Sequence, residues 1–459
     1  MLDVNRTIIA GVALLLIARA GFAVDAEYLS NFDLFWDRIS KAYEESAFLG
    51  NGALGTCIWS AREATLHFDV GDTRVYSEKS RAPIGKFILK TTGKSSGFDM
   101  RLSLYKALAS GTITTDVGKV AFSSLASVKH DVVLTEFSVA GNEEIDIEHF
   151  KLPGAPADKL YAIRNDKSVK LDNPNDFSDP QTYAAIMGMD VVKGLQPEAQ
   201  GEVDGINWRY VPLKGGQAYV LTWVFSEVAP SRWMLVWTTD YEQEGGSLAK
   251  DAGVNVIRRA LATGLATIKK DHFVYWAEYF AKPFISLPDK RMEANYWVQM
   301  YKYGSATRPG ALPIDLMGPW FRATPWPRIW ANLNVQLQYL PMPVANQPGI
   351  AGTLADWIDA NNDIFINAAG EFMADSASCG RGTSPYGPTG FWGEYGNFLW
   401  TLYDYWHFLR VYPDDERTVQ KFYPMLKRAN NFLIHALVKG EDGLLHMPAD
   451  ISPEWKVKG

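Results

Sequence analysis

The hydrophobic pattern of this chain changes its period once, near Ser247, and this change limits what the chain can fold into. From about residue 50 to 240, apolar and polar residues alternate in segments such as "KFILKTT", "DVVLTEFSVA", "EIDIEHF", "AYVLTWVF" and "RWMLVWTT". Such β-branched and aromatic runs of period two are typical of strands, and we expect "MRLSLYKALA" (100–109) to be a further strand. After Ser247, the segment "SLAKDAGVNVIRRALATGLATIKKDHFVYWAEYF" has helical spacing instead.

The order of the two patterns predicts a multidomain β + α protein. A run of strands without intervening helices indicates an antiparallel β-sandwich, which we place at residues 27–245. A helical linker over 246–289 then leads into a helical domain over 290–459. The helices expected in this domain span about 332–345, 350–367, 396–410 and 424–438.

The helical domain is expected to be a ring of helical hairpins, an (α/α)6 toroid. Consecutive helices joined by short loops form hairpins, and a closed ring of six hairpins needs about 12 helices. Only about half that number fits between 290 and 459 at typical helix lengths. We therefore expect the toroid to be incomplete, with the chain ending inside it.

The first 23 residues are expected to be a secretory signal peptide. Arg6 precedes the apolar run "IIAGVALLLIA", and "GFA" at 21–23 supplies small residues at the cleavage positions. A run of about 11 apolar residues is too short to cross a bilayer, so a membrane anchor is the weaker alternative. The mature chain should begin near Val24 and be secreted or periplasmic. Cys57 and Cys379 could form one disulfide there or remain two buried thiols.

Composition argues against some partners and slightly favours others. A net charge of −7 without a long basic run argues against nucleic acid. Sixteen Trp and 21 Tyr slightly favour a carbohydrate ligand, because sugar rings stack on flat aromatic surfaces. The sequence contains no metal-ligand spacing, phosphate-binding glycine loop or nucleophile motif, so we expect neither a metal nor a cofactor.

One carboxylate near the C-terminus has an unusual setting. In "ISPEW" (451–455), Pro453 stiffens the turn before Glu454, and Trp455 follows it. A carboxyl group beside apolar aromatic surface tends to stay protonated, which suits a general acid. The alternative is a solvated loop carboxylate or an acid at a helix N-terminus.

Four segments carry a resemblance to a known family. They are "AFLGNGALGTCIW" (47–59), "HFVYWAEYF…LPDKRMEANYWVQMYKYG" (272–304), "PIDLMGPWFRATPWPRIWANLNVQLQYLPMPVAN" (313–346) and "FYPMLKRANNFLIHAL…ISPEW" (422–455). In this order they resemble glycoside hydrolase family 95, the inverting α-L-fucosidases and α-L-galactosidases, and its bacterial relatives. The resemblance runs from about residue 45 to the last residue and corresponds to roughly the first two-thirds of a typical member.

The resemblance implies an inverting mechanism, which needs an acid and an activated water. Glu454 corresponds to the acid of the family. Asn332 and Asn334 correspond to a pair that aims the water through its amide oxygens, which accept hydrogen bonds but are not bases. The Asp that polarises this water in the family is expected beyond residue 459. A structural alternative is that Asn332 caps the following helix and Asn334 lies in its first turn.

Further candidates could bind the sugar: Trp320, Trp330, Trp392 and Asp450. Most tryptophans at such spacing are core residues, so core packing is the alternative for each ring. Trp330 stands where many members of the family have His, and "SCGRGTSPYGPTGFW" (378–392) replaces a His-rich stretch. Both differences weaken the prediction of fucose specificity.

The resemblance therefore predicts a glycosidase that hydrolyses a terminal α-L-fucoside-like or α-L-galactoside-like bond in an oligo- or polysaccharide. One alternative is a related β-sandwich and toroid glycosidase or phosphorylase with another sugar specificity. A phosphorylase would release a sugar 1-phosphate when phosphate is added. The other alternative is a catalytically impaired carbohydrate-binding remnant. We expect no membrane partner after removal of the signal peptide.

Overall fold

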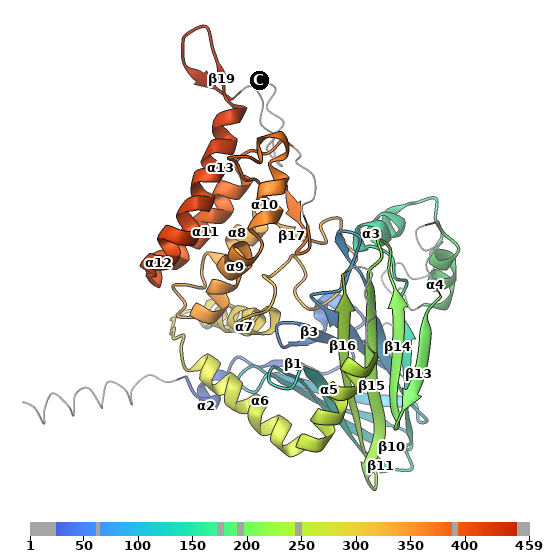
Figure 1. Cartoon of the computed structure of the whole chain (residues 1–459). Helices are drawn as coiled ribbons and strands as arrows, with labels where there is room; N and C mark the ends of the chain where they lie inside the picture. Colours follow the sequence, from blue (N-terminus) through green and yellow to red (C-terminus); the bar gives the residue numbers. More distant parts are fainter. Residues whose placement is uncertain are drawn as a thin grey trace, which may run out of the picture.

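The computed structural model describes residues 24–60, 65–171, 179–190, 197–243, 250–387 and 393–447. Figure 1 shows two halves side by side, a strand half coloured blue to green and a helical half coloured orange to red. Helix α7 (Lys290–Ala306) lies between them. The predicted order, strands first and helices second, is confirmed. The expected signal peptide lies outside the described residues.

Two antiparallel sheets form most of the strand half. The larger sheet contains, in spatial order, β1 (Leu34–Trp36), β8 (Ser95–Ser103), β9 (Leu108–Thr115), β10 (Gly118–Ser127), β11 (Val132–Gly141), β16 (Arg232–Glu242), β15 (Ala218–Ala229), β14 (Ile206–Pro212) and β13 (Ala199–Val203). The smaller sheet contains β12 (Ile145–Lys151), β7 (Gly85–Thr91), β4 (Thr65–Asp72), β3 (Leu54–Trp59) and β2 (Ala47–Gly50). Short elements beside them are α2 (Ala26–Ser30), η1 (Tyr43–Glu45), β5 (Tyr76–Ser77) and β6 (Ser80–Arg81).

The two sheets face each other across a shared apolar core. Alternate residues of β9 are buried, as a period-two pattern requires. Phe68 of the smaller sheet meets Phe122 and Phe137 of the larger sheet edge-on, with ring centroids 5.9 Å apart in both pairs. All three rings are buried. This packing makes the strand half an antiparallel sandwich.

Two details of the strand half differ from the prediction. The segment 100–109 is not one strand, because β8 ends and β9 begins within it and Ala107 adopts a φ of 45° in the turn. The strand half also contains helices, α3 (Ala157–Asn165) and α4 (Pro180–Met187). Asp179 caps α4 by accepting a hydrogen bond from the backbone N–H of Thr182 at 2.9 Å. An Asp-Pro pair is a helix-start signal, which the prediction of strands alone over residues 50–240 did not take into account.

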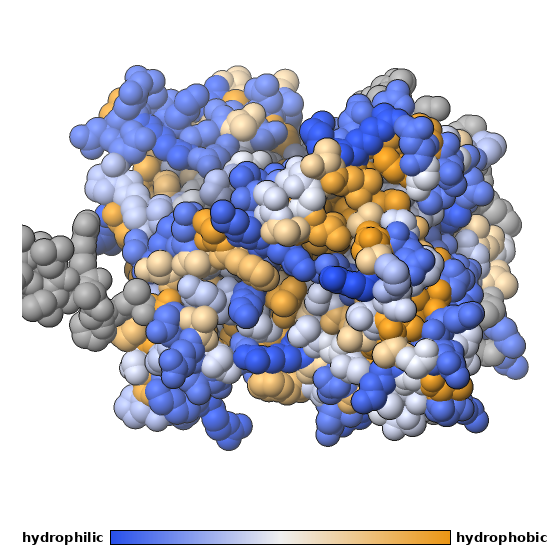
Figure 2. All heavy atoms as spheres, turned by 90° about the horizontal axis from the view of Figure 1, so that it is seen from below, coloured by the Kyte–Doolittle hydropathy of each residue, from blue (hydrophilic) through white to orange (hydrophobic). Residues whose placement is uncertain are grey.

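Helices α5 (Lys250–Thr263) and α6 (Leu265–Phe280) follow the last strand of the larger sheet and pack on its outer face. Gly264, with a φ of 83°, separates the two helices. His272 of α6 is buried, and its Nε2 donates to the backbone oxygen of Lys106 at 2.9 Å, which ties the helix to the β8–β9 turn. Figure 2 shows the molecule from below, where polar side chains surround small apolar patches.

The helical half is built around α11. Its elements are α8 (Asn334–Tyr339), α9 (Pro348–Ala360), α10 (Asn362–Ala368), η2 (Gly370–Phe372), α11 (Asn397–Val411), α12 (Asp415–Arg417), η3 (Thr418–Phe422) and α13 (Tyr423–Ala436), with the short pairs β17 (Ile329–Trp330), β18 (Gly382–Thr383), β19 (Val438–Lys439) and β20 (Leu445–His446). Helix α11 packs against α8, α9 and α13. The helix predicted at 350–367 is two helices, because Asn361 leaves the helical conformation at ψ 34°. The closed toroid stays a prediction.

Glycines at the junction of the halves explain the "LGNGALG" segment (49–55). A Cβ on Gly50 would lie 2.4 Å from the backbone oxygen of Ser305 in α7. A Cβ on Gly71 of β4 would lie 2.0 Å from the backbone oxygen of Pro319. No larger residue permits such a close approach of two backbones, so the glycines allow the helical half to dock on the smaller sheet.

Candidate active site

Asn332 and Asn334 lie on a turn between the short strand β17 and helix α8. The N-cap position of α8 is occupied by Leu333, which makes no capping hydrogen bond, and Asn334 is the first helical residue. Asn332 is therefore not the helix cap, whereas Asn334 does lie in the first turn. The backbone here is a turn rather than the extended segment that would point both side chains the same way.

Asn332 is buried and faces the carboxylate of Glu394. Its amide nitrogen Nδ2 lies 3.4 Å from Oε1 and 3.5 Å from Oε2 of Glu394. An ionised carboxylate only accepts hydrogen bonds, so the NH₂ end of the amide must face it. The carbonyl oxygen Oδ1, which is the acceptor end of the same side chain, is left for another donor.

Glu394 is itself held by two further side chains. Arg381 forms an ion pair with it and donates from Nε to Oε1 at 2.8 Å. Asn397, the first residue of α11, donates from Nδ2 to Oε2 at 2.8 Å. Glu394 is 5% exposed, so these protein groups replace the water that a carboxylate otherwise binds. Because both carboxylate oxygens have fixed donors, the direction in which Asn332 presents its amide is also fixed.

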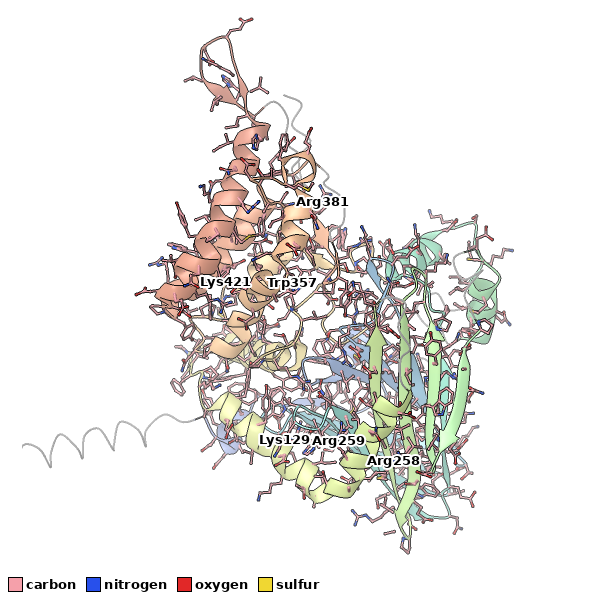
Figure 3. The ribbon with its side chains drawn as sticks, viewed as in Figure 1. Lys129, Arg258, Arg259, Trp357, Arg381 and Lys421 are labelled. Carbon is pink, nitrogen blue, oxygen red and sulfur yellow. The ribbon has the colours of Figure 1, made fainter. Side chains whose placement is uncertain are left out.

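Backbone pairing brings the asparagine turn and the arginine together. Strand β18 pairs with β17, and the backbone N–H of Ala331 donates to the carbonyl oxygen of Arg381 at 2.7 Å. Figure 3 shows Arg381 in the helical half, above Trp357. A Cβ on Gly382 would lie 2.9 Å from the ring of Trp330, so glycine is needed where the two short strands cross.

Further buried polar groups continue from this site along α8 and α11. Gln336 donates to the carbonyl oxygen of Ala331 at 2.6 Å and to Oγ1 of Thr401 at 3.1 Å. Asp404, about one turn beyond Thr401, is 5% exposed, and its Oδ2 has no hydrogen-bond partner in the described part of the chain. Burial raises the pKa of Asp404 to about 8, so this carboxyl group is mainly protonated at neutral pH.

Trp320 and Trp330 are buried, with exposed fractions of 8% and 7%. The indole N–H of Trp320 donates to the backbone oxygen of Leu49 at 2.9 Å, across the junction of the halves. Trp330 packs near Trp326, with ring centroids 6.1 Å apart. Core packing therefore accounts for both rings where the structure places them. A role in sugar binding stays a prediction for each.

Three predicted site residues, Glu454, Asp450 and Trp392, lie outside the described residues. Their roles stay predictions. Cys57 and Cys379 are described, and both are free and buried, which decides between the two alternatives in favour of thiols. Burial raises the pKa of Cys379 to about 12, and the negative charge of Glu394 acts in the same direction, so this thiol stays protonated.

Sequence reasoning did not find Glu394, Arg381 or Asn397. One signal was present, because Arg381 and Glu394 are the only charged residues between Asp375 and Asp404. Two opposite charges in a long uncharged stretch are candidates for a buried pair. The pairing with Asn332 could not be predicted, since it depends on how β17 and β18 meet.

Comparison with known proteins finds a family that the helical half resembles. Residues 282–459 match the Glycosyl hydrolase family 95 catalytic domain. The helical half is thus similar to the family 95 glycoside hydrolases. "Alpha-L-fucosidase 2" of Arabidopsis thaliana is 27% identical over 173 residues, which make up 34% of this chain and 20% of that protein. The matched stretch thus spans only a fifth of the length of this curated relative.

A solved structure is similar across both halves. The "Putative kojibiose phosphorylase from human microbiome" has a TM-score of 0.58 and 14% sequence identity, and the match covers 88% of this chain and 57% of that chain. At this identity the likeness concerns the fold alone. It supports one architecture in which a strand half precedes a helical half. Among the described residues, no helix is both long enough and apolar enough to span a membrane.

Proposed function

We propose that this chain is part of an inverting glycosidase that hydrolyses a terminal α-L-fucoside-like or α-L-galactoside-like bond. The observation that carries the proposal is the orientation of Asn332, whose NH₂ group is held by Glu394. A fixed acceptor oxygen is what the aiming of a nucleophilic water requires. The match of residues 282–459 to the family 95 catalytic domain supports the reaction class.

In this proposal, a water donates a hydrogen bond to Oδ1 of Asn332 and attacks the anomeric carbon. The role of Asn334 as a second acceptor stays a prediction, because the turn before α8 does not direct its side chain the same way. Glu454 protonates the leaving oxygen on the opposite face of the sugar ring. An inverting pair of sites is about 6.5–9.5 Å apart, which leaves room for the water. The proton that the water loses goes to a carboxylate that the family resemblance expects beyond residue 459, because an amide is not a base.

A phosphorylase is the second candidate, because the solved structure that resembles both halves is a putative phosphorylase by title. A phosphorylase must hold phosphate with cationic groups. The arginine of the candidate site, Arg381, is ion-paired with Glu394, so its charge is already balanced. This pairing favours water over phosphate as the nucleophile.

Product analysis tests the proposal. The full-length gene product is incubated with an α-L-fucosyl or α-L-galactosyl oligosaccharide, and the first anomer released is followed by proton NMR. We expect the β-L anomer. Release of the α-L anomer would contradict inversion, and formation of a sugar 1-phosphate on addition of phosphate would favour the phosphorylase. A protein that binds these sugars without cleaving them would be the carbohydrate-binding remnant.

Two substitutions assign the roles. Glu454→Gln keeps the shape of the side chain and removes its proton, so turnover should fall by about 10²–10⁴-fold on a natural oligosaccharide. The loss should be much smaller on a glycosyl fluoride, whose leaving group needs little protonation. Asn332→Ala should lower turnover on both substrates. Asn430→Ala, on the exposed face of α13, is the matched control and should leave turnover unchanged.

We also propose that the protein is secreted or periplasmic. N-terminal sequencing of the exported protein, which should begin near Val24, would test this.

A further inference from the structure

A cavity of about 700 Å³ lies at the junction of the two halves, away from the asparagine turn. Its wall from the strand half is the segment 34–46, and its wall from the helical half is α7 with the loop 316–322. Neither Asn332 nor Asn334 lines it. A volume of this size fits a ligand of one to three sugar rings, since small-molecule sites are commonly about 300–1,000 Å³.

The charges around this junction cavity are unevenly paired. Glu44 of the strand side pairs across the cavity with Arg322 of the helical side at 2.6 Å. On the strand side, Arg38 lies 3.9 Å from both Asp37 and Glu45. On the helical side, Lys302 of α7 has no carboxylate partner within the part of the chain that the structure describes. Lys302 is an exposed residue as a whole, and partial desolvation at the cavity wall lowers the pKa of its ammonium group. Lys302 is thus a cation that a ligand anion could pair.

Aromatic rings form the apolar part of the same cavity. The ammonium group of Lys302 lies 5.5 Å from the ring centroid of Phe48. Phe48 meets Trp320 edge-on, with ring centroids 5.3 Å apart. Across the cavity, the indole N–H of Trp36 donates to the backbone oxygen of Glu45 at 2.7 Å, which holds this ring at the cavity wall. Flat rings offer an apolar surface for a sugar ring, and the ammonium group beside them offers a partner for an anion.

A second cavity, of about 180 Å³, shares Lys302 and Trp320 with the first. Gln338 of α8 lines it and donates from Nε2 to the backbone oxygen of Asp315 at 3.2 Å. The Oε1 atom of Gln338 is buried and has no hydrogen-bond partner in the described ranges. An unpaired acceptor beside Lys302 provides a place for a sugar hydroxyl or a bridging water.

We propose that the junction cavity binds an acidic saccharide, with a carboxylate or sulfate group on Lys302 and the sugar ring against Trp36 and Phe48. A carboxylate and a sulfate would bind in the same way, because each is a negatively charged group on a pyranose ring. The site is separate from the catalytic asparagines, so the proposal stands or falls independently of the proposed hydrolysis.

Calorimetric titration of the full-length protein tests this site. The probes are trigalacturonate, a sulfated galactose disaccharide, the neutral galactose trisaccharide, sodium acetate and sodium sulfate. We expect at least one acidic saccharide to bind at least tenfold more tightly than the neutral trisaccharide, and the two acidic probes distinguish carboxylate from sulfate. Equal binding of acetate or sulfate ions would overturn the proposal in favour of a simple anion site. Absence of binding by both acidic saccharides would also overturn it.

Lys302→Met retains most of the side-chain stem and removes the charge. It should weaken binding of the acidic saccharide at least tenfold, whereas Lys427→Met, on an exposed part of α13, should not. Asn332→Ala should leave this binding unchanged, and a matching loss would place the ligand in the catalytic site instead. Should Lys302→Met fail to fold, the unsubstituted protein gives a second measurement. Bound saccharide should protect Lys302 from acetylation, measured by mass spectrometry, and leave Lys427 unprotected; equal labelling of Lys302 with and without saccharide contradicts the proposal.

Discussion

Two buried arginine–carboxylate pairs, one at the junction of the halves and one beside the candidate catalytic residues, are built differently. At the junction, Arg81 donates to Oδ2 of Asp315 at 2.7 Å. The backbone N–H groups of Met317 and Gly318 donate to Oδ1 of the same carboxylate at 2.8 and 2.7 Å. In the candidate site, the partners of Glu394 besides its arginine are the side-chain amides of two asparagines. Asp315 thus holds backbone N–H groups, with the hydroxyl of Tyr76 as a further donor at 3.3 Å, whereas Glu394, within the described residues, holds side chains alone.

This difference separates a structural role from a functional one. Asp315 holds the loop that leads to Trp320 and so stabilises the docking of the halves. Glu394 sets the direction of an amide whose other end remains available, and buried networks of this kind specify a single arrangement. Changes at the junction pair should therefore act on stability, whereas changes at the site pair should act on turnover.

The largest effect is expected from Arg81→Met. Arg81 and Asp315 are 1% and 4% exposed, so removal of the arginine leaves a buried carboxylate without its cation. Breaking a buried pair on one side typically costs about 3–5 kcal/mol of unfolding free energy. Urea unfolding at neutral pH measures the change.

Two controls sharpen this result. Arg38→Met, at a side chain that is 76% exposed, should change stability by less than about 0.5 kcal/mol. The double variant Arg81→Met with Asp315→Leu should recover part of the loss, because both charges are then gone. A loss below about 1 kcal/mol for Arg81→Met alone would show that the junction pair contributes no more than a surface pair.

A smaller effect, and on turnover instead of stability, is expected from Glu394→Gln. Gln can present either an acceptor or a donor to Asn332, so the amide is no longer held with its NH₂ end inward. We expect kcat on a fucosyl or galactosyl oligosaccharide to fall by about 10–100-fold with little change in KM, as for a misplaced catalytic group. Glu371→Gln, at an exposed position in η2, is the matched control. A rise in KM at constant kcat would mean that Glu394 binds substrate directly.

The sequence predicted the division into a strand half and a helical half, because the period of the hydrophobic pattern depends only on residues that are close together in the chain. The alternation in "DVVLTEFSVA" corresponds to β11, and the stripe near 396–410 corresponds to α11. The break at Asn361 was missed because Asn is only a weak helix breaker, and the apolar spacing continues past it. The turn at Ala107 was also missed, because it contains no glycine or proline that would indicate a turn in the sequence.

The candidate site was only partly predictable. A family resemblance can identify Asn332 by its neighbours in the chain, but Glu394 lies 62 residues away and reaches it only through tertiary contacts. The burial of Trp320 depends on glycines of the strand half, which are also far from it in the sequence. Contacts between remote segments are what a single sequence does not contain.

A pH-dependent effect is expected from Asp404→Asn. An unfolded Asp has a pKa of about 3.9, whereas burial raises the pKa of Asp404 to about 8. Between these values the folded protein holds a proton that the unfolded chain releases, so the free energy of unfolding falls as the pH rises. Asn does not titrate, so its advantage over Asp in unfolding free energy should grow steadily as the pH rises from 4 to 8. Urea unfolding at pH 4, 6 and 8 measures this growth.

Asp363→Asn, on the exposed side of α10, serves as the control and should follow the pH profile of the unsubstituted protein. Parallel profiles for Asp404→Asn and the unsubstituted protein would show that Asp404 is not held protonated. In that case, the burial of Asp404 in the helical half would not lower the free energy of unfolding at neutral pH.

The smallest effect is expected from Tyr386→Phe, which tests whether the junction and the site are linked. Tyr386 lies on the segment that follows Arg381 and β18, and its hydroxyl donates to the backbone oxygen of Arg74 in the strand half at 3.1 Å. Its ring stacks on Tyr241, with centroids 5.3 Å apart. Phe keeps the ring contact and loses the hydrogen bond, which is worth about 0.5–1.5 kcal/mol of stability.

Because Tyr386 anchors the segment that carries Arg381, its replacement should also reach the site, though weakly. Loss of the hydrogen bond alone should lower kcat by less than threefold, whereas Tyr386→Ala removes the stacked ring as well and should lower kcat further, with KM little changed. Thermal unfolding and steady-state kinetics on the same samples separate the two readouts. If Tyr386→Ala loses stability but keeps full kcat, the strand half holds the helical half without positioning Asn332, and the junction and the site are independent. If kcat falls in step with the loss of the anchor, the strand half takes part in catalysis by fixing the arginine that holds Glu394.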